Sequence, residues 1–239
     1  MARFWHFCYL AVIAALVFIA AQFKSDLNDS TPNDSIRFQS ALIRKTNDYG
    51  NVRWLGKPIW QPILDLWTLQ ETIFEVKPEL LIECGTYKGG SSYFFADLFD
   101  LMEKGRVITV DIVKQHNLSH PRVTYLIGDC ASNEIVQQVR EQVQQVNGPV
   151  MVILDSDHSE KHVMRELDAY HSFVTPGSYI HVQDGVIDVL PMFVRGRPGP
   201  LPAIEAFLKS HDEFEVDLER SERFLITHHP KGWLLRKNP

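Results

Sequence analysis

The sequence predicts a doubly wound α/β domain, and three observations lead to that prediction. From about residue 40 onward, short apolar runs alternate with helical stretches, which is typical of a parallel sheet covered by helices on both faces. The first of these runs ends in a glycine-rich loop, where open α/β sheets bind ligands. The 239 residues are 45% apolar and 23% charged, enough for one globular domain with a sizeable core.

The elements follow one another in a regular order. Residues 60–79 space their apolar side chains as an amphipathic helix, which Pro78 closes. Five strands are expected next, within residues 79–84, 106–112, 122–129, 149–157 and 177–185. Helices are expected within residues 91–104, 132–146, 159–174 and 203–211. Residues 214–236 predict two or three strands around turns, which would form an antiparallel C-terminal edge.

Composition excludes several classes of protein. The net charge is −6, and the sequence has no basic stripe that could neutralise phosphates. No nucleic-acid partner is therefore expected. Cys8, Cys84 and Cys130 show neither metal-type spacing nor an even disulfide framework, which excludes a small secreted scaffold. A homo-oligomer stays open.

The N-terminal segment predicts a membrane attachment. Residues 7–21 carry no charge, and Trp5 and Phe23 extend the apolar stretch towards the length of a span. Residues 1–23 are therefore interpreted as a single-pass membrane anchor of open orientation, with a cleaved signal peptide as the alternative. Residues 24–39 resemble a polar stalk, which leaves residues 40–239 for the domain.

The first strand ends in an unusual loop. The spacing Glu83-x-Gly85-x-x-x-Gly89-Gly90 is neither the dinucleotide motif nor a P-loop. Glycines there let backbone N–H groups approach a ligand, with a helix N-terminus behind them. A carboxylate two residues before Gly85 suits a cationic ligand better than a pyrophosphate. Taken alone, the loop fits a purely structural turn equally well.

The next two strands also end in carboxylates. Asp111 ends the second strand, where a carboxylate can accept hydrogen bonds from both hydroxyls of a ribose. Asp129 ends the third, where a side chain can meet an adenine edge. Single aspartates at such positions are usually helix caps or solvated strand ends, but Glu83, Asp111 and Asp129 on three successive strands favour a nucleoside-type cofactor.

The fourth and fifth strand ends predict a site for a hard cation. Asp155, Asp157, Gln183 and Asp184 offer the oxygen ligands that suit Mg²⁺, and neighbouring strands would bring them to one cavity. His158 follows directly and is predicted to be the general base that takes a proton from a bound hydroxyl. The alternative for His158 is a helix cap or a surface residue.

These stretches together resemble the cephalosporin hydroxylase family. The resemblance is carried by residues 83–91, 109–111, 154–158, 177–184, 224–227 and 230–236, and it runs from about Trp60 to Arg236. It implies a Rossmann-like class I methyltransferase sheet and an S-adenosylmethionine-dependent, Mg²⁺-assisted O-methyltransferase acting on a hydroxyl of a sugar or small natural product.

The resemblance also implies roles for individual residues. The cofactor site would comprise Glu83, Gly85, Gly89, Ser91, Asp111 and Asp129. Asp155 and Asp184 would hold Mg²⁺, and His158 would be the base. Similar methyltransferases carry an acidic residue where this chain has Gln183, so the metal site has one negative charge fewer.

Three other functions are compatible with parts of the sequence. They are a non-catalytic S-adenosylmethionine-binding protein, a membrane-anchored glycosyltransferase using Asp155-x-Asp157, and an iron hydroxylase using His158-x-Glu160. The glycine loop with Glu83 argues against the second, and the strand–helix alternation against the third. The acceptor pocket is expected between the loop 186–202 and the helix before the first strand. Trp60, Trp67, Phe193 and Arg195 are candidate contacts there, with core positions as the alternative for the aromatic ones.

Overall fold

The computed structural model describes residues 32–239. The chain divides into two compact units, Met1–Ala41 and Leu42–Pro239. Of the first unit, the described residues form the beginning of helix α2 (Pro32–Lys45), so the polar segment expected as a stalk is helical from residue 32. The expected domain boundary at residue 40 falls inside this helix.

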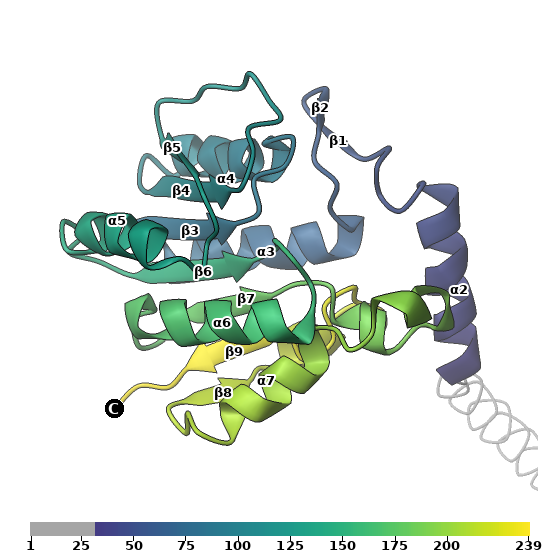
Figure 1. Ribbon diagram of the computed structural model, residues 1–239. Helices are drawn as coiled ribbons and strands as arrows, with labels where there is room; N and C mark the ends of the chain where they lie inside the picture. Colours follow the sequence, from purple (N-terminus) through teal and green to yellow (C-terminus); the bar gives the residue numbers. More distant parts are fainter. Residues whose placement is uncertain (1–31) are drawn as a thin grey trace, which may run out of the picture. The chain divides into compact units, whose positions relative to one another are not determined.

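The second unit contains a sheet of seven strands and the helices that connect them (Figure 1). The strands lie in the order β5-β4-β3-β6-β7-β9-β8. Their bounds are β3 (Leu80–Cys84), β4 (Arg106–Asp111), β5 (Val123–Ile127), β6 (Val150–Leu154), β7 (Tyr179–Val182), β8 (Phe214–Val216) and β9 (Trp233–Arg236). The α-helices are α3 (Ile63–Val76), α4 (Gly90–Leu101), α5 (Asn133–Val143), α6 (Glu160–Tyr170), α7 (Pro200–Leu208) and α8 (Leu218–Glu222).

The remaining elements are short. A two-stranded hairpin, β1 (Arg53–Trp54) with β2 (Lys57–Pro58), precedes α3. Three 3₁₀ turns are η1 (His171–Phe173), η2 (Gly185–Asp188) and η3 (Pro191–Gly196). The predicted loop 186–202 contains η3 and all of η2 but its first residue.

The sheet has the predicted parallel body and antiparallel edge. Strands β5, β4, β3, β6 and β7 pair in parallel, whereas β9 is antiparallel to both β7 and β8. The prediction of a doubly wound class I sheet with an antiparallel C-terminal edge is confirmed. Within residues 214–236 the helix α8 lies between the two strands, because Asp217 caps it by accepting a hydrogen bond from the Arg220 N–H at 3.1 Å.

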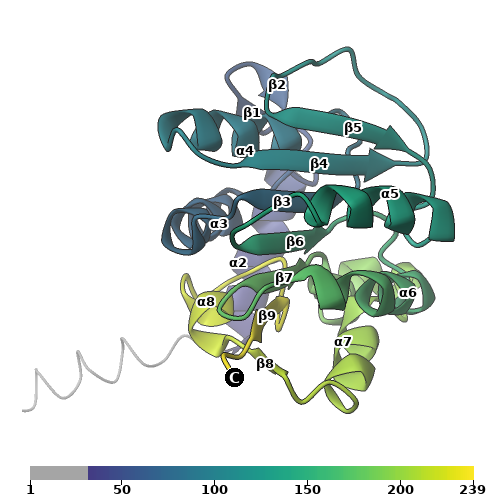
Figure 2. The same cartoon turned by 90° about the vertical axis from the view of Figure 1, so that its left-hand side faces the viewer.

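Helices cover both faces of the sheet (Figure 2). Successive side chains of β3 point alternately into the two cores that lie between the sheet and these helices. Leu80, Ile82 and Cys84 belong to a core that α5, α6 and α7 complete. Leu81 points the other way, into a second core with side chains of α3 and α4, among them the fully buried Phe95. A buried side chain of this size contributes about 1.5–3 kcal/mol, so the two cores hold the strand ends in fixed positions.

The register brings three strand ends to one level. Cys84 pairs with Val110 on β4 and with Leu154 on β6. The residues that follow or end these strands, Gly85, Asp111 and Asp155, therefore lie along the same edge of the sheet. This is the edge at which open α/β sheets bind their ligands.

The predicted membrane attachment requires a correction. Among residues 32–239, no helix combines the length and apolarity needed to cross a bilayer. The longest helices of this part, α2 and α3, have 14 residues each. That is about 21 Å at about 1.5 Å per residue, against about 30 Å of hydrocarbon. The prediction of a single-pass membrane protein with a membrane partner is wrong on this finding. The segment that suggested it, residues 1–23, lies outside the described residues.

Candidate active site

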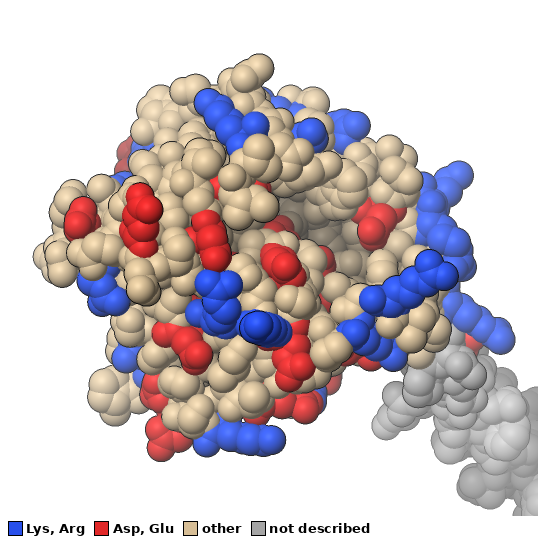
Figure 3. Space-filling model, in the orientation of Figure 1, with Lys and Arg blue, Asp and Glu red and all other residues tan. Residues whose placement is uncertain are grey.

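A cavity of about 830 Å³ opens at the carboxyl edge of the sheet. This volume lies within the range of about 300–1,000 Å³ that small-molecule sites occupy. The molecular surface in Figure 3 is hollowed, with acidic side chains beside the hollow. Of the predicted site residues, nine line this cavity: Gly85, Ser91, Asp111, Asp129, Asp155, Asp157, His158, Gln183 and Asp184. Glu83 and Gly89 are absent from its lining.

The glycines of the first loop are required by neighbouring backbone. A Cβ on Gly85 would lie 1.9 Å from the Asp155 carbonyl oxygen, and one on Gly90 equally close to the Pro58 carbonyl oxygen. Gly85 and Gly89 also have φ values of +103° and +75°, in the left-handed region that favours glycine. At Gly85 and Gly90, glycine is therefore required by the packing of the loop against other backbone segments, as expected for a structural turn.

Glu83 lies beneath the loop. Its Oε2 accepts hydrogen bonds from the hydroxyls of Ser92 and Thr109, each at 2.5 Å, and the side chain is buried. Burial raises the pKa of the Glu83 carboxyl, and hydrogen bonds from Ser91, Ser92 and Thr109 oppose that rise. Glu83 is thus held by hydroxyl groups of the protein and does not line the cavity.

Asp111 and Asp129 line the cavity from the second and third strand ends. The Asp111 carboxylate accepts from the backbone N–H of Tyr87 at 2.7 Å and of Val113 at 3.2 Å. A carboxylate has about four lone-pair positions, so two remain for a ligand. Asp129 accepts from the Ala131 N–H at 2.9 Å and pairs with Arg165 at 3.0 Å.

The environment of Asp129 keeps it ionised. Burial alone would raise the pKa of its carboxyl, but the hydrogen bonds from Arg165 and Ala131 outweigh burial and lower the pKa. The residue is therefore an anchored anion at the cavity wall.

Asp155, His158 and Asp184 form a cluster that also lines the cavity. One ligand atom from each lies within 4.8 Å of the others. His158 Nε2 is 2.9 Å from Asp184 Oδ2 and 4.0 Å from Asp155 Oδ1. The Asp184 backbone has φ 59°, and its N–H donates to His229 Nδ1 at 2.9 Å, which holds the carboxylate in the cavity.

The pKa values of the two carboxylates in the cluster are shifted in opposite directions. Burial raises the pKa of Asp155 and the charge of Asp184 raises it further. For Asp184, burial raises the pKa but the contact with His158 outweighs burial and lowers it. For His158, burial lowers the pKa, but the two carboxylates raise it to about 9. Without a cation, the protonated His158 therefore neutralises Asp184.

Asp157 and Gln183 make other contacts. Asp157 accepts from the Ser159 N–H at 2.8 Å, a turn contact just before α6, and this hydrogen bond lowers the pKa of Asp157. The Gln183 side chain is buried, and its oxygen accepts from Gln61 Nε2 at 2.9 Å. With the amide turned over, its nitrogen donates to Asp155 Oδ1 at 3.1 Å. In both orientations protein groups engage the Gln183 amide.

Two further residues of the site could not be recognised from the sequence, because they belong to no motif. Gln61, just before α3, donates to Asp155 Oδ2 at 2.8 Å and so positions that carboxylate. His228 lines the cavity with its Nε2 at 3.5 Å from Asp184 Oδ1. Of the candidate acceptor contacts, Trp60 and Phe193 line the cavity, whereas Trp67 and Arg195 do not. Trp60 stacks edge-on against Tyr87 at 5.1 Å between ring centroids.

The fold and this cavity define a class I methyltransferase, in which a nucleoside cofactor binds at the ends of the first strands. The chain belongs to the Rhamnosyl O-methyltransferase/CmcI family, whose model matches residues 47–237. It is an S-adenosylmethionine-dependent O-methyltransferase, so the predicted family, enzyme class and nucleoside cofactor are confirmed. Family membership also decides against the glycosyltransferase, the iron hydroxylase and the non-catalytic binding protein.

Relatives and solved structures agree with this assignment. The chain is 32% identical over 201 residues to the rhamnosyl O-methyltransferase of Mycobacterium tuberculosis H37Rv, covering 79% of this chain and 81% of the relative. The Mycobacterium leprae enzyme of the same name is 31% identical over 199 residues, covering 79% and 87%.

Two solved structures share the fold. A structure of CmcI with Mg and SAM matches with a TM-score of 0.64 at 20% identity, covering 80% of this chain and 78% of that one. The MycE methyltransferase from the mycinamycin biosynthetic pathway, with Mg and SAH, matches with a TM-score of 0.50 at 17% identity, covering 72% and 49%.

Proposed function

We propose that this protein transfers the methyl group of S-adenosylmethionine to a hydroxyl of a rhamnose or related sugar residue, assisted by Mg²⁺. The observation that carries the proposal is the position of the Asp155, His158 and Asp184 cluster in the same cavity as Asp111 and Asp129. A bound cofactor and an acceptor hydroxyl would therefore meet inside one cavity. The relatives named rhamnosyl O-methyltransferases support the sugar as acceptor.

The donor set of the cluster fits a hard divalent cation. Asp155 and Asp184 are half-buried carboxylates, and the charge of Asp184 raises the pKa of Asp155, a repulsion that a cation would relieve. Asp155 and Asp184 would hold Mg²⁺, which polarises an acceptor hydroxyl when it is bound. Gln61 keeps Asp155 oriented, and the His229 contact keeps Asp184 oriented.

His158 is proposed to take the proton of the acceptor hydroxyl. It can do so only when the carboxylates beside it are neutralised, because their charge raises its pKa to about 9. The acceptor oxygen then forms a bond to the methyl carbon as the carbon–sulfur bond breaks, which leaves S-adenosylhomocysteine. The cavity walls would hold the two reactants in line.

A product assay tests this function. The full chain is incubated with S-adenosylmethionine, Mg²⁺ and matched pairs of rhamnosides and glucosides, and methylated product is identified by mass spectrometry. We expect product with the rhamnosides. Binding of S-adenosylhomocysteine without methyl transfer to any glycoside would contradict the sugar as acceptor.

The cofactor half of the site is tested by Asp111→Ala. We expect its affinity for S-adenosylhomocysteine to fall about 10-fold or more, because a charge-assisted hydrogen bond contributes roughly 1.5–3 kcal/mol. Isothermal titration calorimetry measures the change. Asp212→Ala, at an exposed position outside the cavity, is the matched control. Unchanged affinity in Asp111→Ala would remove Asp111 from the cofactor site.

The missing charge at position 183 is tested by Gln183→Glu. A carboxylate here stands beside Asp155 and can still accept from Gln61, so it should strengthen the attraction to a divalent cation. We expect half-maximal activation at several-fold lower Mg²⁺. Gln145→Glu adds the same charge at an exposed site and should leave the activation curve unchanged. An unshifted curve in Gln183→Glu would separate this position from the metal.

A further inference from the structure

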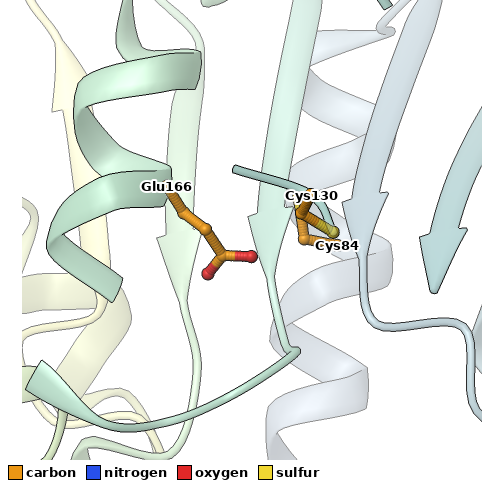
Figure 4. A group of neighbouring side chains, drawn as sticks. All are labelled: Cys84, Cys130 and Glu166. Carbon is orange, nitrogen blue, oxygen red and sulfur yellow. The ribbon is translucent and has the colours of Figure 1, made fainter. Parts of the chain in front are cut away.

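A second cluster of ligand-type side chains lies behind the cavity, between β3, the loop after β5 and α6. Cys84, Cys130 and Glu166 are all buried, with exposed fractions of 0%, 3% and 1%. One ligand atom from each lies within 4.8 Å of the others. Figure 4 shows the Glu166 carboxylate pointing from α6 towards the two cysteines. Only the fold brings these residues together, since their spacing in the sequence matches no metal motif.

One oxygen of Glu166 lacks a hydrogen-bond partner. Its Oε1 accepts from the Ser156 hydroxyl at 2.6 Å and lies 3.5 Å from His162 Nε2. The hydrogen bond to Glu166 raises the pKa of His162. Its Oε2 is buried and has no partner among the described residues. A buried polar oxygen without a partner is destabilising until a proton or a cation meets it.

The thiols complete a donor set that differs from the one at Asp155 and Asp184. Burial raises the pKa of the Cys84 thiol, and its contact with Cys130 raises the pKa further, so the Cys84 thiol is neutral before a metal arrives. Two sulfur ligands and one carboxylate suit a thiophilic cation and are poor ligands for Mg²⁺. Cys130 also lines the cofactor cavity, which gives a cation a way in.

We propose that Cys84, Cys130 and Glu166 bind one thiophilic divalent cation of the Zn²⁺ class, with a water molecule as the fourth ligand. Binding releases the two thiol protons to solvent, so the thiolates and the carboxylate face the cation with opposite charge. Three protein ligands and one water make the four-coordinate arrangement that Zn²⁺ prefers. The site is independent of the proposed methyl transfer, because it uses none of the residues assigned to that reaction.

The test uses the full chain, reduced, stripped of metal, and held in excess Mg²⁺ to occupy the oxygen site. Co²⁺ and Cd²⁺ are titrated while the thiolate-to-metal charge-transfer absorption is recorded. We expect one equivalent per chain to produce the band and Zn²⁺ to displace Co²⁺. Glu166→Gln should weaken binding about 10-fold or more, and Cys130→Ala should remove the band. Cys8→Ser removes the remaining cysteine of the sequence and should retain the band.

Folding of each variant is checked by circular dichroism and thermal unfolding. If Cys130→Ala does not fold, the titration of the Cys8→Ser protein and of Glu166→Gln decides the question. A missing band in the unaltered chain would overturn the site. A band of equal strength and affinity in Cys8→Ser and Glu166→Gln would remove the carboxylate ligand and overturn the proposed donor set.

Discussion

Asp184→Asn is expected to lower kcat about 1,000-fold or more while leaving the affinity for S-adenosylhomocysteine within about twofold. Loss of metal-assisted charge stabilisation costs several kcal/mol, and about 4 kcal/mol corresponds to that factor. Asparagine keeps the size of the side chain and tolerates the φ of 59° at this position, so the backbone should be retained. The cofactor wall at Asp111 and Asp129 belongs to other strand ends.

The measurement combines single-turnover kinetics with calorimetric titration of S-adenosylhomocysteine. Asp212→Asn makes the same chemical change at an exposed position and should behave as the unaltered enzyme. An Asp184→Asn variant that keeps its kcat would show that this carboxylate is not needed for the reaction. A variant that loses cofactor affinity to the same extent as kcat would show that the two walls are not independent.

Removal of the divalent cation should have an effect of the same size. We expect methyl transfer to stop in EDTA and to return with millimolar Mg²⁺. The affinity of the site for Mg²⁺ should be modest, because Mg²⁺ keeps several waters and the site offers only two carboxylates. The Gln183 amide is already engaged by Gln61 or Asp155.

Formation of S-adenosylhomocysteine is followed before chelation, in EDTA and after back-titration with Mg²⁺. Cofactor affinity measured in EDTA is the control, and it should not change. Full methyl transfer in EDTA would contradict metal assistance and leave His158 as the sole group acting on the acceptor proton.

Much of the fold and of the cavity is readable from the sequence, because both follow from local patterns. Each parallel strand is a short apolar run, and the polar residues that end these runs meet because parallel strands end at one edge. Asp111, Asp129, Asp155 and Asp184 therefore line one cavity. The same reasoning could not show that the Glu83 side chain is buried outside the cavity lining, since that depends on its hydrogen bonds with Ser92 and Thr109.

Other parts of the site depend on contacts between distant segments. Gln61 lies 94 residues from Asp155 along the chain, and no motif joins them. His228 follows an irregular segment and reaches Asp184 only because β9 pairs with β7. Cys84 and Cys130 meet through the pairing of β3 with β4 and of β4 with β5. Such pairings leave no periodic signal in a single sequence.

The hydrogen bonds of Gln61 to Asp155 and Gln183 bear on the order in which the domain folds. The segment around Gln61 leaves the ribosome before the sheet does, yet its partners Asp155 and Gln183 lie 94 and 122 residues later. Closing such long loops costs chain entropy that only a formed sheet can offset. We infer that the sheet forms first and that Gln61 reaches Asp155 and Gln183 last. Pulse-labelled hydrogen exchange during refolding would then show protection of the β3 and β6 amides before that of Gln61, and the methyl-transfer site would be the final part of the domain to mature.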